Sequence, residues 1–195
     1  MCNNLSMARK YELKRRAEKQ AETRRRIVEA AIELHGTKGP ARTTLSDVAR
    51  LAGVERHTLY RHFPSERDLF LACSGRYWEL NPPPDPEQWR SIADPEARLR
   101  QGLGDVYDFY ERTEEMRASV LRDAEWDPLT QEIVAHRGGP LMAVIRDMLA
   151  EGVRGRRRLA ALDLALDFYA WRRLRRSGLS RKDSVGTMVA AVFAQ

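Results

Sequence analysis

Thr-Thr-Leu-Ser-Asp-Val-Ala-Arg-Leu-Ala-Gly-Val-Glu-Arg-His-Thr-Leu-Tyr-Arg-His-Phe occupies residues 43–63 and predicts two short helices joined by a tight turn. Thr44 or Thr43 suits the N-cap of the first helix. At Gly53 the chain has to turn with positive φ or leave the helix without a Cβ clash. The apolar residues fall on the inner faces of the two helices: Leu45, Val48 and Ala49 on the first, and Val54 and Leu59 on the second.

The outward face of the second helix consists of side chains that donate hydrogen bonds. These side chains are Arg56, His57, Thr58, Tyr60, Arg61 and His62. Other surface helices of the chain mix acids with bases, whereas this one does not. Because a helix of this kind enters the major groove of DNA from a helix-turn-helix unit, the pattern predicts a DNA reader.

The excess positive charge lies in the same part of the chain. Residues 1–80 contain 16 Lys and Arg against 10 Asp and Glu, whereas residues 81–195 contain 18 of each. Basic residues on their own often do no more than solvate a surface. Their concentration beside a candidate reading helix instead favours neutralisation of DNA phosphates.

Cysteine usage and hydropathy exclude several classes of protein. Cys2 and Cys73 match no metal spacing, and we expect no structural disulfide and a reducing compartment. No run approaches the ~18 apolar residues of a membrane span. Residues 1–26 carry nine basic and three acidic residues without an apolar core, which is unlike a signal peptide. We therefore expect a cytoplasmic protein, associated with the nucleoid and not with a membrane.

Helical periodicity dominates the chain, and no useful stretch alternates with period two, so we expect an all-α fold of about nine helices. Residues 1–20 are expected to fray or to continue into the first helix, which Gly39-Pro40 ends. A run of prolines at 81–86 marks a loop. Later helices are expected near 94–112, 114–124, 128–153 with a possible break at Gly138-Gly139-Pro140, 156–176 and 180–194.

This layout resembles the tetracycline-repressor (TetR) family of bacterial transcription regulators, most sharply over residues 24–72. The matching motifs are Asp47-Val48-Ala49, Ala52-Gly53-Val54, Thr58-Leu59-Tyr60-Arg61-His62-Phe63, and Ser65 with Leu69. Beyond residue 80 the resemblance rests on length and helix count. It implies a basic N-terminal extension at 1–22, a three-helix helix-turn-helix domain at 23–66, and a helical regulatory, ligand-binding and dimerisation domain at 67–195.

Carried over by position, the resemblance assigns DNA contacts to these residues. Thr43 and Thr44 would donate to phosphates. Arg56, His57 and Thr58 would read bases, where a bidentate Arg–guanine pair contributes about 1–3 kcal/mol of discrimination. Tyr60, Arg61 and His62 would clamp the backbone. Two alternatives stay open, in which His62 is a helix C-cap and Tyr60 a half-buried packing residue.

Two charged features around this domain leave alternatives open. Glu66 stands where the family often has a Lys that touches a phosphate; Glu66 suits a helix N-terminus but cannot bind phosphate, and whether Arg67 replaces the contact is open. A basic segment precedes the domain and is either an arm that enters the minor groove or a solvated tail. It contains Lys10, Lys14, Arg15, Arg16, Arg24, Arg25 and Arg26.

The C-terminal helices predict a homodimer. Val185, Met188, Val189, Val192 and Phe193 form a helical stripe, and the helix at 156–176 is apolar over more than one face. Two such helices from each subunit would make a symmetric four-helix interface. A monomer with an internal hairpin is the weaker alternative, because a lone recognition helix reads few bases.

A ligand pocket is implied mainly by the resemblance. Its candidate residues are Trp89, Tyr107, Tyr110, Trp126, Met142, Phe168 and Trp171. Aromatic and Met side chains at helical spacing are more often plain core. Gly102 and Gly104 leave room inside a helix for a neighbouring helix or for a ligand. The expected effector is a small apolar or aromatic molecule, with no cofactor and no metal.

An enzyme is the remote alternative. The four histidines are dispersed, and no metalloprotease, phosphate-loop or nucleophile-elbow motif occurs. We therefore expect no catalytic residues. The sequence predicts a ligand-responsive transcriptional regulator, a repressor, that binds a palindromic operator as a homodimer and is released by a small-molecule effector. The nearer alternative is a constitutive dimeric DNA-binding protein without a ligand.

Overall fold

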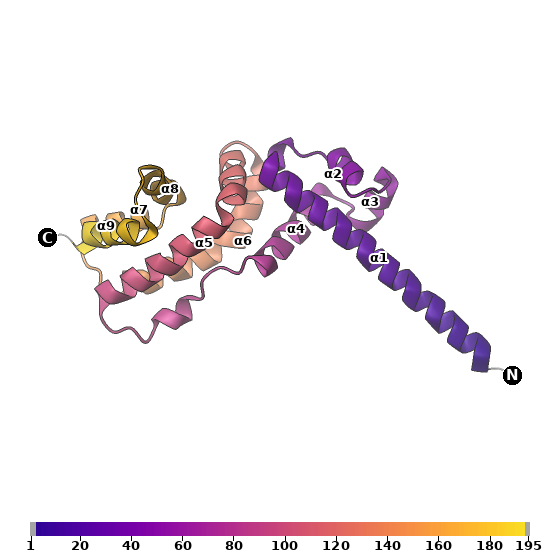
Figure 1. Ribbon diagram of the computed structural model, residues 1–195, viewed down its shortest axis with the longest axis horizontal. Helices are drawn as coiled ribbons and strands as arrows, with labels where there is room; N and C mark the ends of the chain where they lie inside the picture. Colours follow the sequence, from indigo (N-terminus) through magenta and orange to yellow (C-terminus); the bar gives the residue numbers. More distant parts are fainter. Residues whose placement is uncertain (1–2, 194–195) are drawn as a thin grey trace. The chain divides into compact units, whose positions relative to one another are not determined.

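The computed structural model describes residues 3–193 of the chain, with side chains from Tyr11 onward (Figure 1). Over that range the fold is all-α, as predicted, with no strand. The elements are α1 (Asn3–Thr37), η1 (Pro40–Arg42), α2 (Leu45–Leu51), α3 (Arg56–His62), α4 (Glu66–Leu80), η2 (Pro86–Trp89), α5 (Pro95–Ala124), α6 (Pro128–Ala150), α7 (Arg156–Ala165), α8 (Phe168–Arg176) and α9 (Arg181–Phe193). None of these described helices has the length and apolarity that a membrane span requires.

The chain forms two compact units. The first contains residues 1–77 and 119–133, and the second contains residues 78–118 and 134–195. The predicted functional domains at 1–22, 23–66 and 67–195 stay a prediction. Cys2 lies outside the described residues, as does the side chain of Lys10.

The first unit is built around the end of α1, which packs against α2, while α2 packs against α3 (Figure 1). The turn between α1 and α2 depends on Gly39, whose φ of 95° suits glycine, and on Pro40, which cannot continue a helix. Gly53 has a φ of 63° and makes the turn between α2 and α3. The core joins these helices to α4 and to the start of α6; its largest members include Ile27, Leu59, Phe63, Phe70 and Ile133.

The N-terminal segment continues α1 as one helix from Asn3 onward. Its described side chains between residues 11 and 22 are all exposed. An α-helix is about 10–12 Å across, whereas the minor groove of B-DNA is about 6 Å wide. In this helical form the segment does not fit the minor groove as an extended arm would.

The second unit differs from the expected helix boundaries in three places. The helices expected at 94–112 and 114–124 are one helix, α5, because neither Gly nor Pro separates them; the Thr113 hydroxyl is satisfied within the helix by donating to the carbonyl of Phe109 at 2.6 Å. The break considered at 138–140 is absent, and α6 runs through Pro140. The helix expected at 156–176 is instead two, with Asp167 capping α8 by accepting from the Ala170 amide.

The predicted stripe on α9 faces its own unit. Val185, Met188, Val189 and Val192 are buried in one subunit, where α9 packs against α7 and α8. The burial of these residues therefore needs no partner chain. The large apolar side chains that α7 and α8 leave exposed are Leu164 and Tyr169, at 55% and 42% exposure.

Candidate nucleic-acid interface

The start of α2 is held by a capping box. The hydroxyl of Thr44 accepts from the amide of Asp47 at 3.1 Å, while the Thr44 amide donates to the Asp47 carboxylate at 3.3 Å. Asp47 also accepts from Lys38 at 2.6 Å and from Arg50 at 3.1 Å. The hydrogen bonds from Lys38 and Thr44 hold the pKa of Asp47 well below its usual range. The cap thus fixes the end of α2 that is expected to meet a phosphate.

The two threonines before α2 differ in exposure. Thr44 is exposed, but its hydroxyl already donates to the Asp47 carboxylate at 2.9 Å. Thr43 is 7% exposed, and its hydroxyl donates to the carbonyl of Gly39 at 2.8 Å. The side chain of Thr43 therefore stabilises the α1–α2 turn, and its single hydroxyl proton is already used in this hydrogen bond.

The outward face of α3 carries most of the predicted DNA contacts together. Arg56, His57, Tyr60 and Arg61 are exposed, Thr58 is partly exposed, and Leu59 fills the core on the inner side. The guanidinium of Arg56 donates to the hydroxyl of Tyr60 at 3.3 Å and lies 5.6 Å from its ring centroid. His57 Nε2 lies 3.3 Å from the Thr58 hydroxyl. Five polar groups are thus presented on one short helix.

His62 and Phe63 close α3 against α1. The guanidinium of Arg24 lies 4.5 Å from the centroid of the buried Phe63 ring. His62 is half-buried, and its Nε2 has no hydrogen-bond partner among the described residues. Burial, followed by the charges of Arg61 and Arg24, lowers the pKa of His62. The neutral imidazole is therefore favoured here, which suits packing as much as a phosphate contact.

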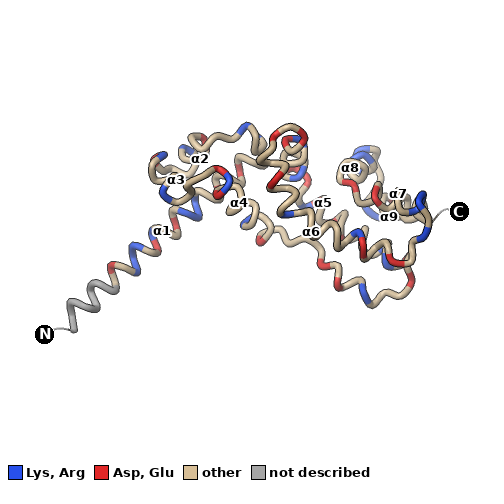
Figure 2. The backbone as a smooth tube through the Cα atoms, turned by 180° about the vertical axis from the view of Figure 1, so that it is seen from behind, with Lys and Arg blue, Asp and Glu red and all other residues tan. Residues whose placement is uncertain are grey.

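The arginine run at the middle of α1 is partly engaged within the protein. Arg25 pairs with Glu22 at 2.8 Å and with Glu29 at 3.1 Å, and Arg24 covers Phe63. Arg26 is exposed beside the turn at Gly53. Figure 2 shows these basic positions continuing along α1 next to α3. Arg26 is thus the member of the run whose side chain is best placed to meet DNA.

Asp123, near the C-terminal end of α5, is a positioning residue that sequence patterns do not reveal. Its buried carboxylate accepts from the amide of Ala41 at 3.1 Å and from Arg122 at 2.8 Å. A Cβ on Gly39 would collide with Arg122 and Asp123. Because Ala41 lies 82 residues earlier in the chain, no local spacing could have indicated this anchor of the loop that leads into α2.

The candidate ligand residues do not gather at one place. Trp126 belongs to the first unit and is exposed, whereas the other six belong to the second unit. Trp89 is buried and donates to Asp105 at 2.7 Å, and Met142 is half-buried. Four form one buried aromatic cluster with ring centroids 5.5–6.4 Å apart: Tyr107, Tyr110, Phe168 and Trp171.

Both tyrosines of this aromatic cluster are tied to the backbone. Tyr107 donates to the carbonyl of Ala165 at 2.9 Å, and Tyr110 donates to that of Leu166 at 2.6 Å. Burial raises the pKa of Tyr110 to about 12 and raises that of Tyr107 further. Trp171 differs, because its buried Nε1–H has no acceptor among the described residues. The two tyrosine hydroxyls are structural, and the indole is the unsatisfied group of the cluster.

The glycines of α5 have different surroundings. A Cβ on Gly102 would lie 2.5 Å from Leu149 of α6, whereas a Cβ on Gly104 would have nothing within 4 Å. Close helix packing thus accounts for Gly102. Nothing in the structure explains Gly104. In the described side chains, no group of three His, Cys, Asp or Glu could hold a metal ion.

Sequence similarity to the curated relatives covers about a third of the chain. The HTH-type transcriptional regulator TtgR of Pseudomonas putida is 45% identical over 60 residues, which are 31% of this chain and 29% of TtgR. AcrR of Shigella flexneri, also an HTH-type transcriptional regulator, is 38% identical over 60 residues, covering 31% of this chain and 26% of AcrR. The HTH-type transcriptional repressor BepR of Brucella suis is 36% identical over 64 residues, covering 33% of this chain and 31% of BepR. The matched regions span less than a third of these relatives.

Similarity of fold extends over most of the chain. The hemolysin II transcriptional regulator HlyIIR has a TM-score of 0.69 at 15% identity, covering 90% of this chain and 99% of that one. Residues 27–73 match the family described as "Bacterial regulatory proteins, tetR family". These residues include the α1–α2–α3 arrangement with its exposed α3 face. The relatives named above are transcriptional regulators and not enzymes. Residues 27–73, which contain the helix-turn-helix, thus match the tetR family of bacterial regulatory proteins, and the chain as a whole shares its all-helical fold with HlyIIR.

Proposed function

We propose that the chain is a cytoplasmic transcriptional repressor that binds a palindromic DNA site as a homodimer and releases it when a small molecule binds. The observation that carries the proposal is the outward face of α3, where Arg56, His57, Thr58, Tyr60 and Arg61 lie together without an acidic neighbour on that helix. The family match over residues 27–73 and the similarity to TtgR support this assignment.

The roles of the α3 residues, reading bases or contacting phosphates, follow from their positions on the helix and their side-chain chemistry. Arg56, His57 and Thr58 lie in the first turn, the end of a recognition helix that meets base edges. Arg61 lies one turn later, is exposed, and is assigned to the DNA phosphates. The Tyr60 hydroxyl still has lone pairs and its own proton, so it is able to donate to a phosphate while accepting from Arg56.

Dimerisation is the second element of the proposal. Since the α9 stripe is buried within one subunit, the interface would use the remaining exposed apolar groups of α7 and α8, which include Leu164 and Tyr169. The exposed face of α9 carries small residues, among them Ala190 and Ala191, that allow close helix approach. A two-fold dimer places two α3 helices on half-sites about 34–36 Å apart.

Ligand responsiveness is the third element. Trp171 supports it, because a buried indole N–H without an acceptor is a group that a ligand oxygen could satisfy. FadR from Bacillus subtilis, which shares the fold with a TM-score of 0.60 at 14% identity and 87% coverage of this chain and 98% of that one, is in complex with stearoyl-CoA. A ligand with different affinities for two conformations would change the spacing of the recognition helices.

A constitutive dimeric DNA-binding protein is the second candidate. It is favoured by the bonded hydroxyls of Tyr107 and Tyr110, which leave the aromatic cluster largely complete without a ligand. Both candidates bind DNA, but they differ in their response to small molecules.

The test uses the purified full chain. The proposal expects a dimer by sedimentation, a shift of the DNA upstream of its own gene at moderate salt, and loss of that shift with a small apolar molecule that also raises the melting temperature. A shift that no co-purified or added molecule alters would favour the constitutive candidate. Failure to bind any DNA at moderate salt would contradict both.

A further inference from the structure

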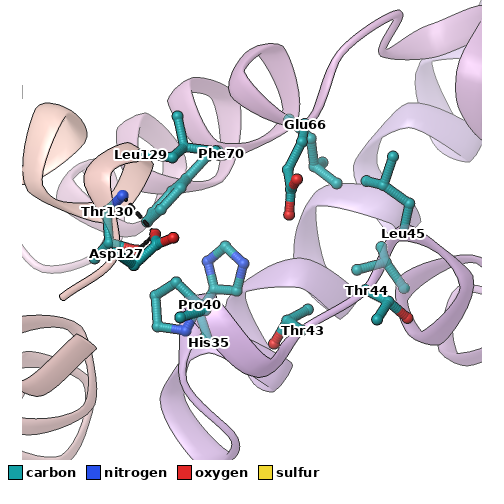
Figure 3. Close-up of a pocket in the computed structure, with 13 residues that line it drawn as sticks. His35, Pro40, Thr43, Thr44, Leu45, Glu66, Phe70, Asp127, Leu129 and Thr130 are labelled. Atoms are coloured by element: carbon teal, nitrogen blue, oxygen red, sulfur yellow. Dashed lines mark hydrogen bonds between the residues drawn. The ribbon is translucent and has the colours of Figure 1, made fainter. Parts of the chain in front are cut away.

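The first unit contains a cavity of about 190 Å³ that the DNA-binding role does not use (Figure 3). It is enclosed by the end of α1, η1, the start of α2, the start of α4, and the residues that open α6. An apolar cavity of about 150 Å³ is large enough to hold benzene. A molecule of one ring and a short polar substituent therefore fits this volume.

The hydroxyl groups that line the cavity have no proton left for a ligand. Thr43 donates to the Gly39 carbonyl at 2.8 Å, and Thr44 donates to Asp47 at 2.9 Å. Thr130 donates to Asp127 at 2.5 Å. A hydroxyl has one proton and two lone pairs, so each of these three groups meets a ligand as an acceptor.

The carboxylates of the lining are incompletely satisfied. Glu66 has no hydrogen-bond or ion-pair partner among the described residues, and Figure 3 shows it extending from α4 toward His35. Asp127 accepts two hydrogen bonds from Thr130 through Oδ2, while its Oδ1 has no described donor. The lining contains neither Lys nor Arg. The charged side chains of the lining are therefore acidic: Glu66, which is exposed at the start of α4, and Asp127, which accepts from the first turn of α6.

His35 adds an acceptor to the same wall. Its ring is 8% exposed, and burial lowers its pKa to about 4, so it is neutral at pH 7. Its Nδ1 lies 3.5 Å from the sulfur of Cys73, whose thiol donates to the Phe70 carbonyl at 3.3 Å. In the tautomer whose Nδ1 donates to this sulfur, Nε2 is left with a lone pair.

The remaining wall is apolar and favours an organic ion over a metal. Leu69, Phe70 and Leu129 contribute to it. The three titratable side chains of the lining are not arranged so that they could hold a metal ion together. Separated acceptors around an apolar surface instead suit a ligand with several N–H donors on an apolar body.

We propose that this cavity binds a small protonated amine with an aromatic or aliphatic body, the ammonium group being held by Glu66 and the neighbouring acceptors. The site lies within the DNA-reading unit, and it is separate from the aromatic cluster of the second unit. An occupant would touch both the start of α2 and the start of α4, which are the elements that bracket the recognition helix.

The experiment titrates benzylamine, protonated at pH 7, into the full chain and follows backbone amide chemical shifts. The proposal expects saturable shifts around Thr43, Thr44 and Thr130, and none with benzoate or benzyl alcohol at the same concentrations. Glu66→Gln should weaken binding about tenfold, by the ordinary strength of a charge-assisted hydrogen bond. Glu125→Gln, which removes the same charge from an exposed position of the same unit outside the cavity, should leave it unchanged.

Three results would overturn the proposal: no saturable binding of benzylamine, shifts confined to the second unit, or equal binding of benzoate. Unchanged affinity in a folded Glu66→Gln protein would do the same. If that variant does not fold, the proposal is still tested on the unmodified chain, by comparing the three ligands and by locating the amide chemical-shift changes. Because no DNA is present, failure here leaves the proposed repressor function untouched.

Discussion

The guanidinium of Arg56 donates to the hydroxyl of Tyr60, one turn later on α3, at 3.3 Å. Arg56, the candidate base reader, is thus held in place by Tyr60, the candidate phosphate contact. Their contributions to DNA affinity should therefore be coupled. In a double-mutant cycle, Arg56→Ala and Tyr60→Phe should lower DNA affinity by less together than the sum of their separate effects. Fluorescence anisotropy on one duplex measures the cycle. Strict additivity would show that the contact has no role in the complex.

Base reading by Arg56 has its own signature. Arg56→Ala should cost about 1–3 kcal/mol on the specific site and flatten the preference at one base pair. Arg154→Ala, an exposed arginine of the second unit, is the control and should change neither quantity. Binding to a panel of single-base variants provides the measurement. Equal losses on specific and random DNA would refute the assignment.

The two glycines of α5 should respond in opposite directions to alanine. Gly104→Ala should raise the free energy of unfolding by about 0.5–1 kcal/mol, because its Cβ meets nothing and alanine favours a helix. Gly102→Ala should lower it by about 1–3 kcal/mol, because its Cβ would press on Leu149. Denaturant unfolding of the two variants compares them directly. Equal effects would contradict the close packing at Gly102.

Asp123 should matter for both stability and DNA binding. Asp123→Ala removes the acceptor of the Ala41 amide and leaves Arg122 without its carboxylate, so we expect a loss of about 2–4 kcal/mol. Operator affinity should fall as well, because the loop before α2 loses its anchor. Asp147→Ala, at an exposed position, should stay within about 0.5 kcal/mol. A stable Asp123→Ala protein with full affinity would contradict the anchoring role.

His35 should make stability depend on pH. Its folded pKa of about 4 lies below its ordinary value of 6.5, so the unfolded chain binds this proton first as the pH falls. The contribution of neutral His35 to the free energy of unfolding is fully present above pH 6.5. It is lost between pH 6.5 and about 4, by roughly 2–3 kcal/mol in total. His35→Gln should flatten unfolding curves measured across that window. Asp47 also has a lowered folded pKa, but its contribution to the free energy of unfolding is lost only below its ordinary pKa of 3.8. It therefore does not interfere with the pH window of His35.

Structural features that depend on residues close together in the chain could be predicted from the sequence. Helical spacing and the glycine at 53 predicted the two helices and their turn, which the structure confirms. The all-α fold is confirmed in the same way. The division of 94–124 into two helices was wrong, because no breaker lies between them and Thr113 bonds back into the helix.

Features that depend on distant contacts could not be predicted. Thr43 looks like an exposed cap in sequence, but the fold places its hydroxyl on the Gly39 carbonyl. The stripe on α9 correctly indicated a buried face, yet periodicity cannot say whether its own unit or a partner covers it. The cavity beside His35 joins five segments, and its Glu66 was considered in sequence only as a departure from a phosphate contact.

The most direct test of the central claim is the ratio of affinities for specific and random DNA. A specific site can be selected from a random library with the full chain, and both duplexes measured at one salt concentration. We expect a ratio of about 10³ or more, falling close to one when Arg56, His57 and Thr58 are all replaced by Ala. A ratio near one for the unmodified chain, or an unchanged ratio in the folded triple variant, would contradict the account of α3 as the reading helix.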